Sequence, residues 1–103
     1  MVRDEHLPLT ETTFYILLVL NQPLHGYAAM QKIRQLSHEQ VKIAAGTMYG
    51  AIEKLLKLRW IQEVPSADQR RRVYQLTDSG RIILKLETDR LRELSRLAAD
   101  FNY

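Results

Sequence analysis

The pattern of apolar and polar positions predicts four helices and one pair of strands. The first helix is expected at residues 10–20, where Thr10 caps a continuous apolar run and residues 21–23 follow as a turn. The run alone is also compatible with a buried strand, and the cap and the turn favour the helix. A second helix follows up to about Leu36, and residues 41–43 alternate as a short edge strand would. The inward stripe of the second helix is predicted to be Tyr27, Met30, Ile33 and Leu36.

The middle of the chain is predicted to form a third helix that leads directly into a β-hairpin. Gly46 or Thr47 is expected to cap this helix. Strand-like alternation at residues 60–64 and 71–76, with turn residues 65–69 between them, is typical of a hairpin. The inward face of the third helix is predicted to consist of Met48, Ile52 and Leu55.

The last helix is expected to run from Thr77, its cap, to about residue 101. A helix of about 24 residues is about 36 Å long, which is more than a domain of this size needs for its own core. The helix at 10–20 is apolar on every side and therefore also has a face to cover. We expect two copies of the chain to pair through these two helices. The predicted interface residues are Phe14, Leu17, Leu84, Leu91, Leu94, Ala98 and Phe101, with Glu87 interrupting the heptad pattern.

The composition is that of one globular domain. The chain has 103 residues, of which 46% are hydrophobic and 26% are charged. It contains no cysteine, which excludes disulfides and thiolate-bound metals. No secretory signal is visible, and the longest apolar run, Phe14–Leu20, is far shorter than the about 20 residues that cross a bilayer. We therefore expect a cytoplasmic protein that does not bind membranes.

The positive charge is concentrated in the helix and hairpin of residues 46–74. This stretch carries six basic and three acidic residues, which accounts for the whole net charge of +3. A basic supersecondary unit is typical of a surface that binds nucleic acid. A solvated face that happens to be basic would have the same composition.

Eight residues of this stretch are candidates for contacts with DNA. Recognition helices contact base edges through their N-terminal residues, where small side chains let the backbone come close. Lysines further along such a helix reach phosphates, although they also serve solubility alone. Adjacent arginines repel one another and add no packing, so phosphate contact explains them better than a solvated tip does. The candidates are Thr47, Tyr49, Gly50, Lys54, Lys57, Arg70, Arg71 and Arg72.

An enzyme is not expected. The three histidines have no carboxylate partners at a telling spacing, and no glycine-rich phosphate loop is present. His25 is interpreted as a cap or turn residue rather than a metal ligand. Trp60 is interpreted as a packing residue at the junction of helix and strand, with ligand stacking as the alternative. No cofactor is therefore predicted.

Four segments also resemble one known family, the PadR-like transcriptional regulators. The segments LTETTFYILLVL, PLHGY, GTMYGAIEKLL and RRRVYQLTDSGR stand in the order and spacing of that family's DNA-binding domain. The resemblance covers about residues 7–98. It implies a mainly α fold with a small β-hairpin, a winged helix-turn-helix, in which residues 1–76 bind DNA and residues 77–103 form a C-terminal dimerisation helix.

The resemblance implies a homodimeric repressor that binds a pseudo-palindromic operator in double-stranded DNA. Thr47 and Tyr49 match the start of the family's recognition helix, and the arginines at 70–72 match its wing. A small aromatic effector could bind at the dimer interface, between residues 10–20 and 78–101. The alternative is a winged helix that serves protein–protein contact, which predicts a wing without concentrated positive charge.

Overall fold

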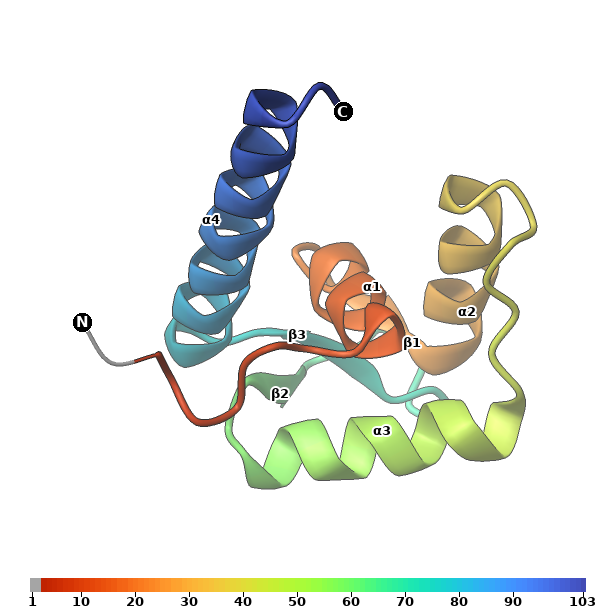
Figure 1. The fold of residues 1–103 in the computed structure, drawn as a ribbon. Coiled ribbons are helices and arrows are strands. Elements are labelled where there is room, and N and C mark those ends of the chain that lie inside the picture. Colours follow the sequence, from red (N-terminus) through yellow and green to blue (C-terminus); the bar gives the residue numbers. More distant parts are fainter. Residues whose placement is uncertain (1–2) are drawn as a thin grey trace.

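The computed structural model describes residues 3–103, which form four helices and a small sheet (Figure 1). The predicted order of three helices, a hairpin and a last helix is confirmed, and the helix boundaries lie within about two residues of those expected. The elements are α1 (Glu11–Val19), β1 (Leu24–His25), α2 (Gly26–Leu36), α3 (Ala45–Lys57), β2 (Ile61–Val64), β3 (Val73–Leu76) and α4 (Asp78–Asp100).

The sheet has three antiparallel strands in the order β1-β3-β2, one more than the hairpin that the sequence predicts. The additional strand, β1, is two residues long and pairs Leu24 with Tyr74 and His25 with Val73. A strand of two residues is too short to produce a readable alternation. Its consequence is that the start of α2 is attached to the return strand of the hairpin.

The core is built around α1, which lies between α4 and α2 and above α3 (Figure 1). Ile16 and Leu17 on this helix and Leu20, its C-cap, are at most 1% exposed, and they pack with residues from all three other helices and the sheet. The predicted inward residues of α3 are buried as well. An all-apolar helix is explained by this central position, because most of its circumference is covered within one chain.

The inward stripe predicted for α2 is wrong at two of its four positions. Tyr27 and Leu36 are 58% and 50% exposed. The buried residues of the helix are instead Gly26, Ala29 and Ile33. Two of these three residues are small, so a prediction from large hydrophobic residues alone identified the wrong face of the helix as buried.

The connector between α2 and α3 also differs from expectation. Residues 41–43 form no strand, and the Val41 N–H instead donates to Ser37 Oγ at 2.9 Å. The N-cap of α3 is Ala44, whose side chain makes no capping hydrogen bond, so neither Gly46 nor Thr47 is the cap. Both residues lie in the first turn of the helix, where they remain exposed.

Thr77 and Gly80 fix the start of α4 against the end of α3. Thr77 Oγ1 accepts the Gly80 N–H at 3.1 Å, as predicted for a cap, and also donates to the Arg59 carbonyl at 2.6 Å. A Cβ on Gly80 would lie 2.0 Å from the carbonyl oxygen of Trp60, so only glycine fits there. Trp60 is buried at this junction, in agreement with the packing role expected for it.

Glu87 does not merely interrupt the heptad pattern of α4. It is 1% exposed, and its Oε2 accepts the backbone N–H of Leu9 at 2.7 Å. The Arg90 guanidinium pairs with both of its carboxylate oxygens. These hydrogen bonds, first those from Arg90, hold the pKa of Glu87 below its ordinary value of 4.5 although burial opposes the shift. Glu87 thus anchors the N-terminal segment to α4.

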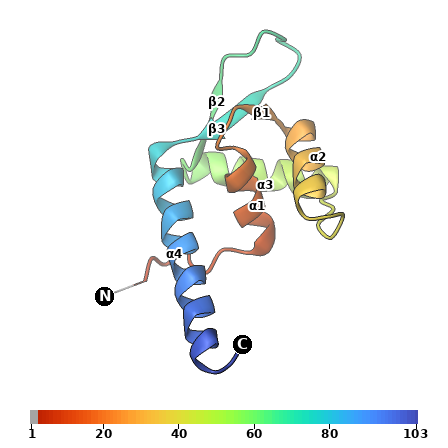
Figure 2. The same cartoon turned by 90° about the horizontal axis from the view of Figure 1, so that it is seen from above.

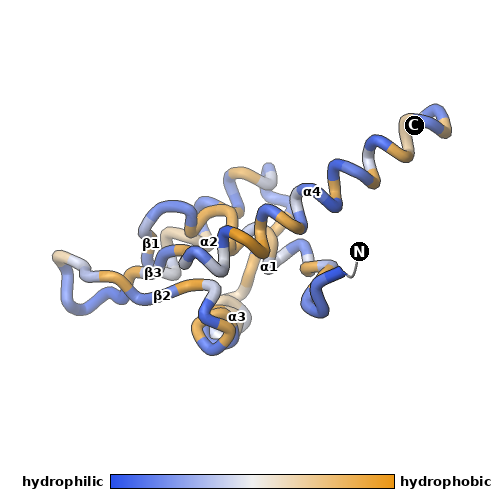
Figure 3. Tube along the Cα trace, turned by 90° about the vertical axis from the view of Figure 1, so that its left-hand side faces the viewer, coloured by the Kyte–Doolittle hydropathy of each residue, from blue (hydrophilic) through white to orange (hydrophobic). Residues whose placement is uncertain are grey.

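The hairpin and α4 project from the body on opposite sides (Figure 3). Figure 2 shows the loop of the hairpin extending beyond β1, far from the C-terminal end of α4. Within the part of the chain that the structure describes, no helix is long and apolar enough to cross a bilayer.

Candidate nucleic-acid interface

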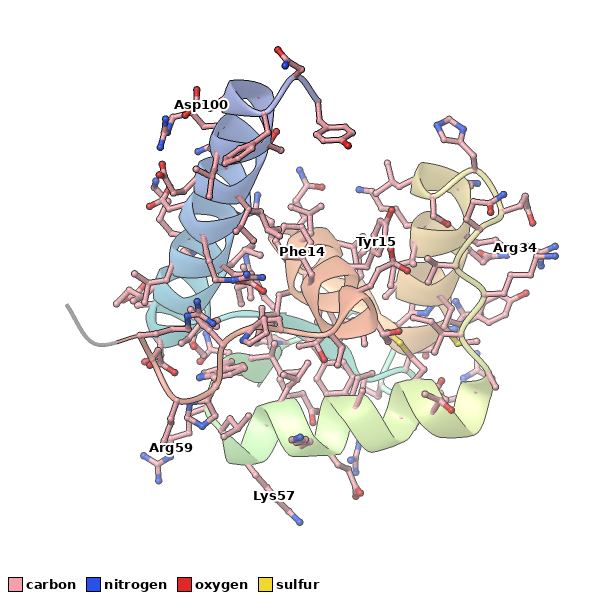
Figure 4. The ribbon with its side chains drawn as sticks, in the orientation of Figure 1. Phe14, Tyr15, Arg34, Lys57, Arg59 and Asp100 are labelled. Atoms are coloured by element: carbon pink, nitrogen blue, oxygen red, sulfur yellow. The ribbon has the colours of Figure 1, made fainter. Side chains whose placement is uncertain are left out.

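The outer face of α3 is exposed to solvent. Thr47, Gly50, Lys54 and Lys57 are all exposed on it. Figure 4 shows Lys57 extending away from the body below α3. A Cβ on Gly50 would meet no atom within 4 Å, so the backbone of the helix is open to approach at this point. The structure thus brings the predicted helix residues together on one surface.

The loop between β2 and β3, which we call the wing (residues 65–72), is ordered by Asp68. Its Oδ1 accepts the Arg70 N–H at 3.0 Å, and its carbonyl accepts the Arg71 N–H at 3.1 Å. Ser66 completes the turn, because its hydroxyl accepts the Asp68 N–H at 3.2 Å. This arrangement is an Asx-type turn, and it sets the direction in which the arginines leave the backbone.

The three wing arginines are exposed and only loosely paired. Their closest carboxylate contacts are Arg70 to Asp68 at 3.5 Å, Arg71 to Asp68 at 3.9 Å and Arg72 to Glu63 at 4.0 Å. Ion pairs of this length on the surface contribute little energy. The guanidinium groups therefore remain available to an anion from solution.

A cleft of about 480 Å³ separates the wing from the N-terminal half of α3. Tyr49 lines this cleft, and its ring lies against the start of α2. A Cβ on Gly26 would be 2.9 Å from Tyr49 Cε1, so the glycine at this position lets the ring lie there. The residues that line the cleft are His25, Gly26, Tyr27, Tyr49, Tyr74 and the three wing arginines.

His25 joins this surface, although the sequence assigned it only a capping or turn role. As N-cap of α2, its Nδ1 accepts the Ala28 N–H at 3.2 Å, which agrees with that assignment. Its Nε2 lies 3.0 Å from Arg71 Nη1, 46 residues further along the chain. The sequence contains no signal for this contact, because it depends on the pairing of β1 with β3.

The apolar residues predicted to pair two copies are mostly exposed along α4. Leu91, Leu94 and Phe101 are 42%, 50% and 68% exposed. Leu17 is the exception, since it is completely buried within the chain and cannot meet a partner. On α1 the residue that is exposed is its neighbour Leu18. The remaining candidates, Phe14, Leu84 and Ala98, are partly buried.

A groove of about 440 Å³ runs between α1 and α4. Leu91 of α4 and the side chains of Phe14 and Tyr15, labelled in Figure 4, line it together with Leu18. Glu87 and Arg90 contribute its polar part. Among residues 3–103, no cluster of three or more histidine or carboxylate side chains could hold a metal ion.

Comparison with protein families identifies one match. The model of the Transcriptional regulator PadR-like family matches residues 16–86 of this chain, which include α3 and the wing. A search of curated proteins finds no match.

Solved structures with the same fold are numerous. A transcriptional regulator from Clostridium thermocellum is 24% identical, with a TM-score of 0.72 over 86% of this chain and 90% of that chain. A PadR-like transcription factor from Bacteroides fragilis is 19% identical, with a TM-score of 0.74 over 87% and 88% of the two chains. Bacillus subtilis PadR, solved in complex with operator DNA, is 22% identical, with a TM-score of 0.63 over 76% and 46%. These similarities confirm the winged helix-turn-helix fold.

Proposed function

Because the chain belongs to the PadR-like family of transcriptional regulators, we propose that it is a homodimeric repressor that binds a specific operator in double-stranded DNA. The family consists of regulators rather than enzymes, in agreement with the sequence analysis. The observation that carries the proposal is the shared surface of α3 and the wing, where an open helix face stands beside three exposed arginines.

The two elements have different roles in the proposed complex. The N-terminal half of α3, with Thr47, Tyr49 and Gly50, enters the major groove and contacts base edges. Lys54, Lys57 and the wing arginines reach phosphates on either side, which adds affinity without sequence information. The similar structure of Bacillus subtilis PadR was solved with operator DNA, and this supports a DNA partner for the present chain.

Dimerisation is supported by the apolar stripe of α4. Leu84 is partly buried against the body, and Leu91, Leu94, Ala98 and Phe101 continue the same stripe beyond it. A stripe of this kind needs a cover, and a second α4 with the exposed part of α1, at Phe14 and Leu18, provides a self-complementary one. Two copies related by a two-fold axis bind a pseudo-palindromic operator.

Repression, and its release by a small molecule, are the further parts of the proposal. The resemblance to the PadR-like family favours repression over activation. The groove between α1 and α4 supports an effector site, since its volume is in the range of small-molecule pockets and two aromatic side chains line it. An aromatic compound bound there would contact both helices that we propose to form the dimer.

Fluorescence anisotropy at physiological salt tests the proposal. One duplex carries the sequence upstream of the protein's own gene, and the other is an unrelated duplex of equal length. We expect at least about a 10³-fold difference in affinity. Equal and weak binding to both, and to a genomic library of duplexes, would contradict the proposal and favour a protein partner for the winged helix.

Variants separate the roles of the wing and α3 in the same assay. Arg71→Ala combined with Arg72→Ala should weaken binding to all duplexes and reduce the salt slope by about one to two units. Tyr49→Ala should weaken binding to the operator more than to unrelated DNA. Lys85→Ala, which removes a charge on α4, is the matched control and should leave both affinities unchanged. A wing variant that binds as well as the control would exclude the wing from the DNA interface.

A further inference from the structure

The two contacts that His25 makes, to Ala28 and to Arg71, cannot both be hydrogen bonds. A guanidinium has N–H donors and no acceptor. The Nδ1 of His25 already accepts the Ala28 N–H at 3.2 Å, and Nε2 lies 3.0 Å from Arg71 Nη1. Both contacts would be hydrogen bonds only if both ring nitrogens carried lone pairs, and a histidine ring carries a proton on at least one of them.

The cap indicates where this proton lies. Because Nδ1 accepts a backbone N–H at the start of α2, we assign the ring proton to Nε2. Nε2–H and the Nη1–H groups of Arg71 are then two neighbouring donors with no acceptor between them. Asp68 does not supply one, because it approaches Arg71 from the Nε side, at 3.9 Å.

The surroundings of these donors favour an anion. They open into the cleft between the wing and α3, whose lining consists of three arginines, three tyrosines, His25 and Gly26. An oxygen about 3 Å from both Nε2 and Nη1 would accept a hydrogen bond from each. One of these bonds comes from a charged donor, and such bonds are the stronger ones.

We propose that His25 and Arg71 bind one phosphate group of the DNA backbone between them. The inference rests on the proposed function and adds His25 to the DNA-binding residues. The DNA backbone is the source that the fold favours, because the cleft lies between the two elements that the duplex would contact. The shared phosphate would connect the start of α2 to the wing, and so fix how deeply α3 enters the groove.

The variant His25→Asn tests this inference without removing the cap. Asparagine is among the best N-cap residues, so its Oδ1 can accept the Ala28 N–H, but its side chain is too short to place a donor at the position of Nε2. We expect operator affinity to fall three- to tenfold, with the thermal unfolding midpoint unchanged. His38→Asn, the same substitution at the other end of α2, is the matched control and should bind like the wild type.

Combining substitutions tests whether the two side chains share one phosphate. If they do, the loss of affinity in the double variant His25→Asn, Arg71→Ala should be smaller than the product of the two single losses. A duplex with one neutral methylphosphonate at the contacted position should bind the wild type and His25→Asn equally. Multiplicative losses, together with a His25→Asn effect that persists at every methylphosphonate position, would overturn the shared site.

A competition arm distinguishes DNA phosphate from free phosphate. Inorganic phosphate should displace DNA from the wild type no better than chloride at equal ionic strength. Stronger displacement that disappears in His25→Asn, while DNA affinity is unchanged by the substitution, would assign the site to a free anion and overturn the inference. Failure of the proposed function would be distinguishable from failure of this inference, because the wild type itself would then show no preference for any duplex.

Discussion

A single buried carboxylate joins the N-terminal segment to α4. Glu87 binds the Leu9 N–H and the Arg90 guanidinium, and all three groups lie where α1 begins. A charged side chain on an otherwise apolar face is expensive unless each oxygen has a partner. Both oxygens of Glu87 have a hydrogen-bond partner here. The structure therefore requires a carboxylate at this position.

Replacement of this carboxylate should change both the stability and its dependence on pH. Because the pKa of Glu87 is lowered in the folded state, its contribution is complete above about pH 4.5 and is lost as the pH falls through the folded-state value. Glu87→Gln should therefore lower the free energy of unfolding at pH 7 by about 1–2 kcal/mol. Thermal unfolding at pH 7 and pH 3.5 measures this, and the difference between the two proteins should shrink at pH 3.5. An equal difference at both pH values would contradict the ion-pair explanation.

Two other residues show what the sequence does not reveal at this scale. Arg59 has a φ of 61° and closes α3 with the Trp60 N–H bonded to the Leu55 carbonyl, an ending in which glycine is usual. Gly80 looks like an unfavourable residue in the first turn of α4, yet the Trp60 carbonyl excludes any side chain there. At Gly80 the backbone of a neighbouring element decides the residue, whereas Arg59 has the positive φ of a helix end; a pattern of hydrophobicity reveals neither.

At the scale of elements, the wing combines a hydrogen-bonded turn with exposed charges. The backbone of residues 68–71 is held by Asp68, while the arginine side chains are exposed and only loosely paired. The carboxylate that orders the turn also lies close to Arg70 and Arg71 and reduces their combined charge. Order and charge at the wing are therefore separable by substitution.

Asp68→Asn should separate them. The amide oxygen can still accept the Arg70 N–H, so the turn should be retained, while one negative charge is removed from the proposed DNA interface. We expect affinity for unrelated duplexes to rise about two- to fivefold and the salt dependence to become steeper. Anisotropy titrations at several salt concentrations measure both quantities. Weaker binding would mean that the carboxylate itself helps to place the arginines.

Long periodic elements were predictable from the sequence, and short or shared ones were not. The helices α3 and α4 and the hairpin strands follow hydrophobic patterns, and Thr10 and Thr77 mark the starts of α1 and α4 as caps. The two-residue strand β1 has no such pattern, although it places His25 beside the wing. The α3 and wing residues of the candidate interface were therefore predictable, whereas the cleft that connects them was not.

On the scale of the whole molecule, α4 extends well beyond the body that it starts from. The longest dimension is 52 Å, against 31 and 21 Å for the others. Figure 3 shows apolar positions recurring along the projecting part of the helix. A domain of this size buries only about two thirds of its unfolded surface, so further burial between two chains would contribute substantially to its stability.

Leu94→Glu should disrupt the proposed pairing. Leu94 is half exposed in the single chain, so the substitution should not unfold it, but two glutamates would face one another across a two-fold axis. Analytical ultracentrifugation should show a monomer, and operator affinity should fall at least tenfold. Ile82→Glu is the control, because Ile82 is also apolar and exposed, at 61%, but lies outside the stripe. Two variants with the mass of a dimer would exclude this stripe from the interface.

The projection of α4 on the side opposite the wing has a mechanical consequence for such a dimer. With 23 residues the helix is about 34 Å long, so a change of about 5° in the angle at which two copies cross moves their far ends relative to one another by about 3 Å. The crossing angle of the two α4 helices would therefore set the distance between the two α3 helices of the dimer. That distance must match one turn of DNA. Side chains on α4 that never contact the operator would thus determine which half-site spacing the dimer binds.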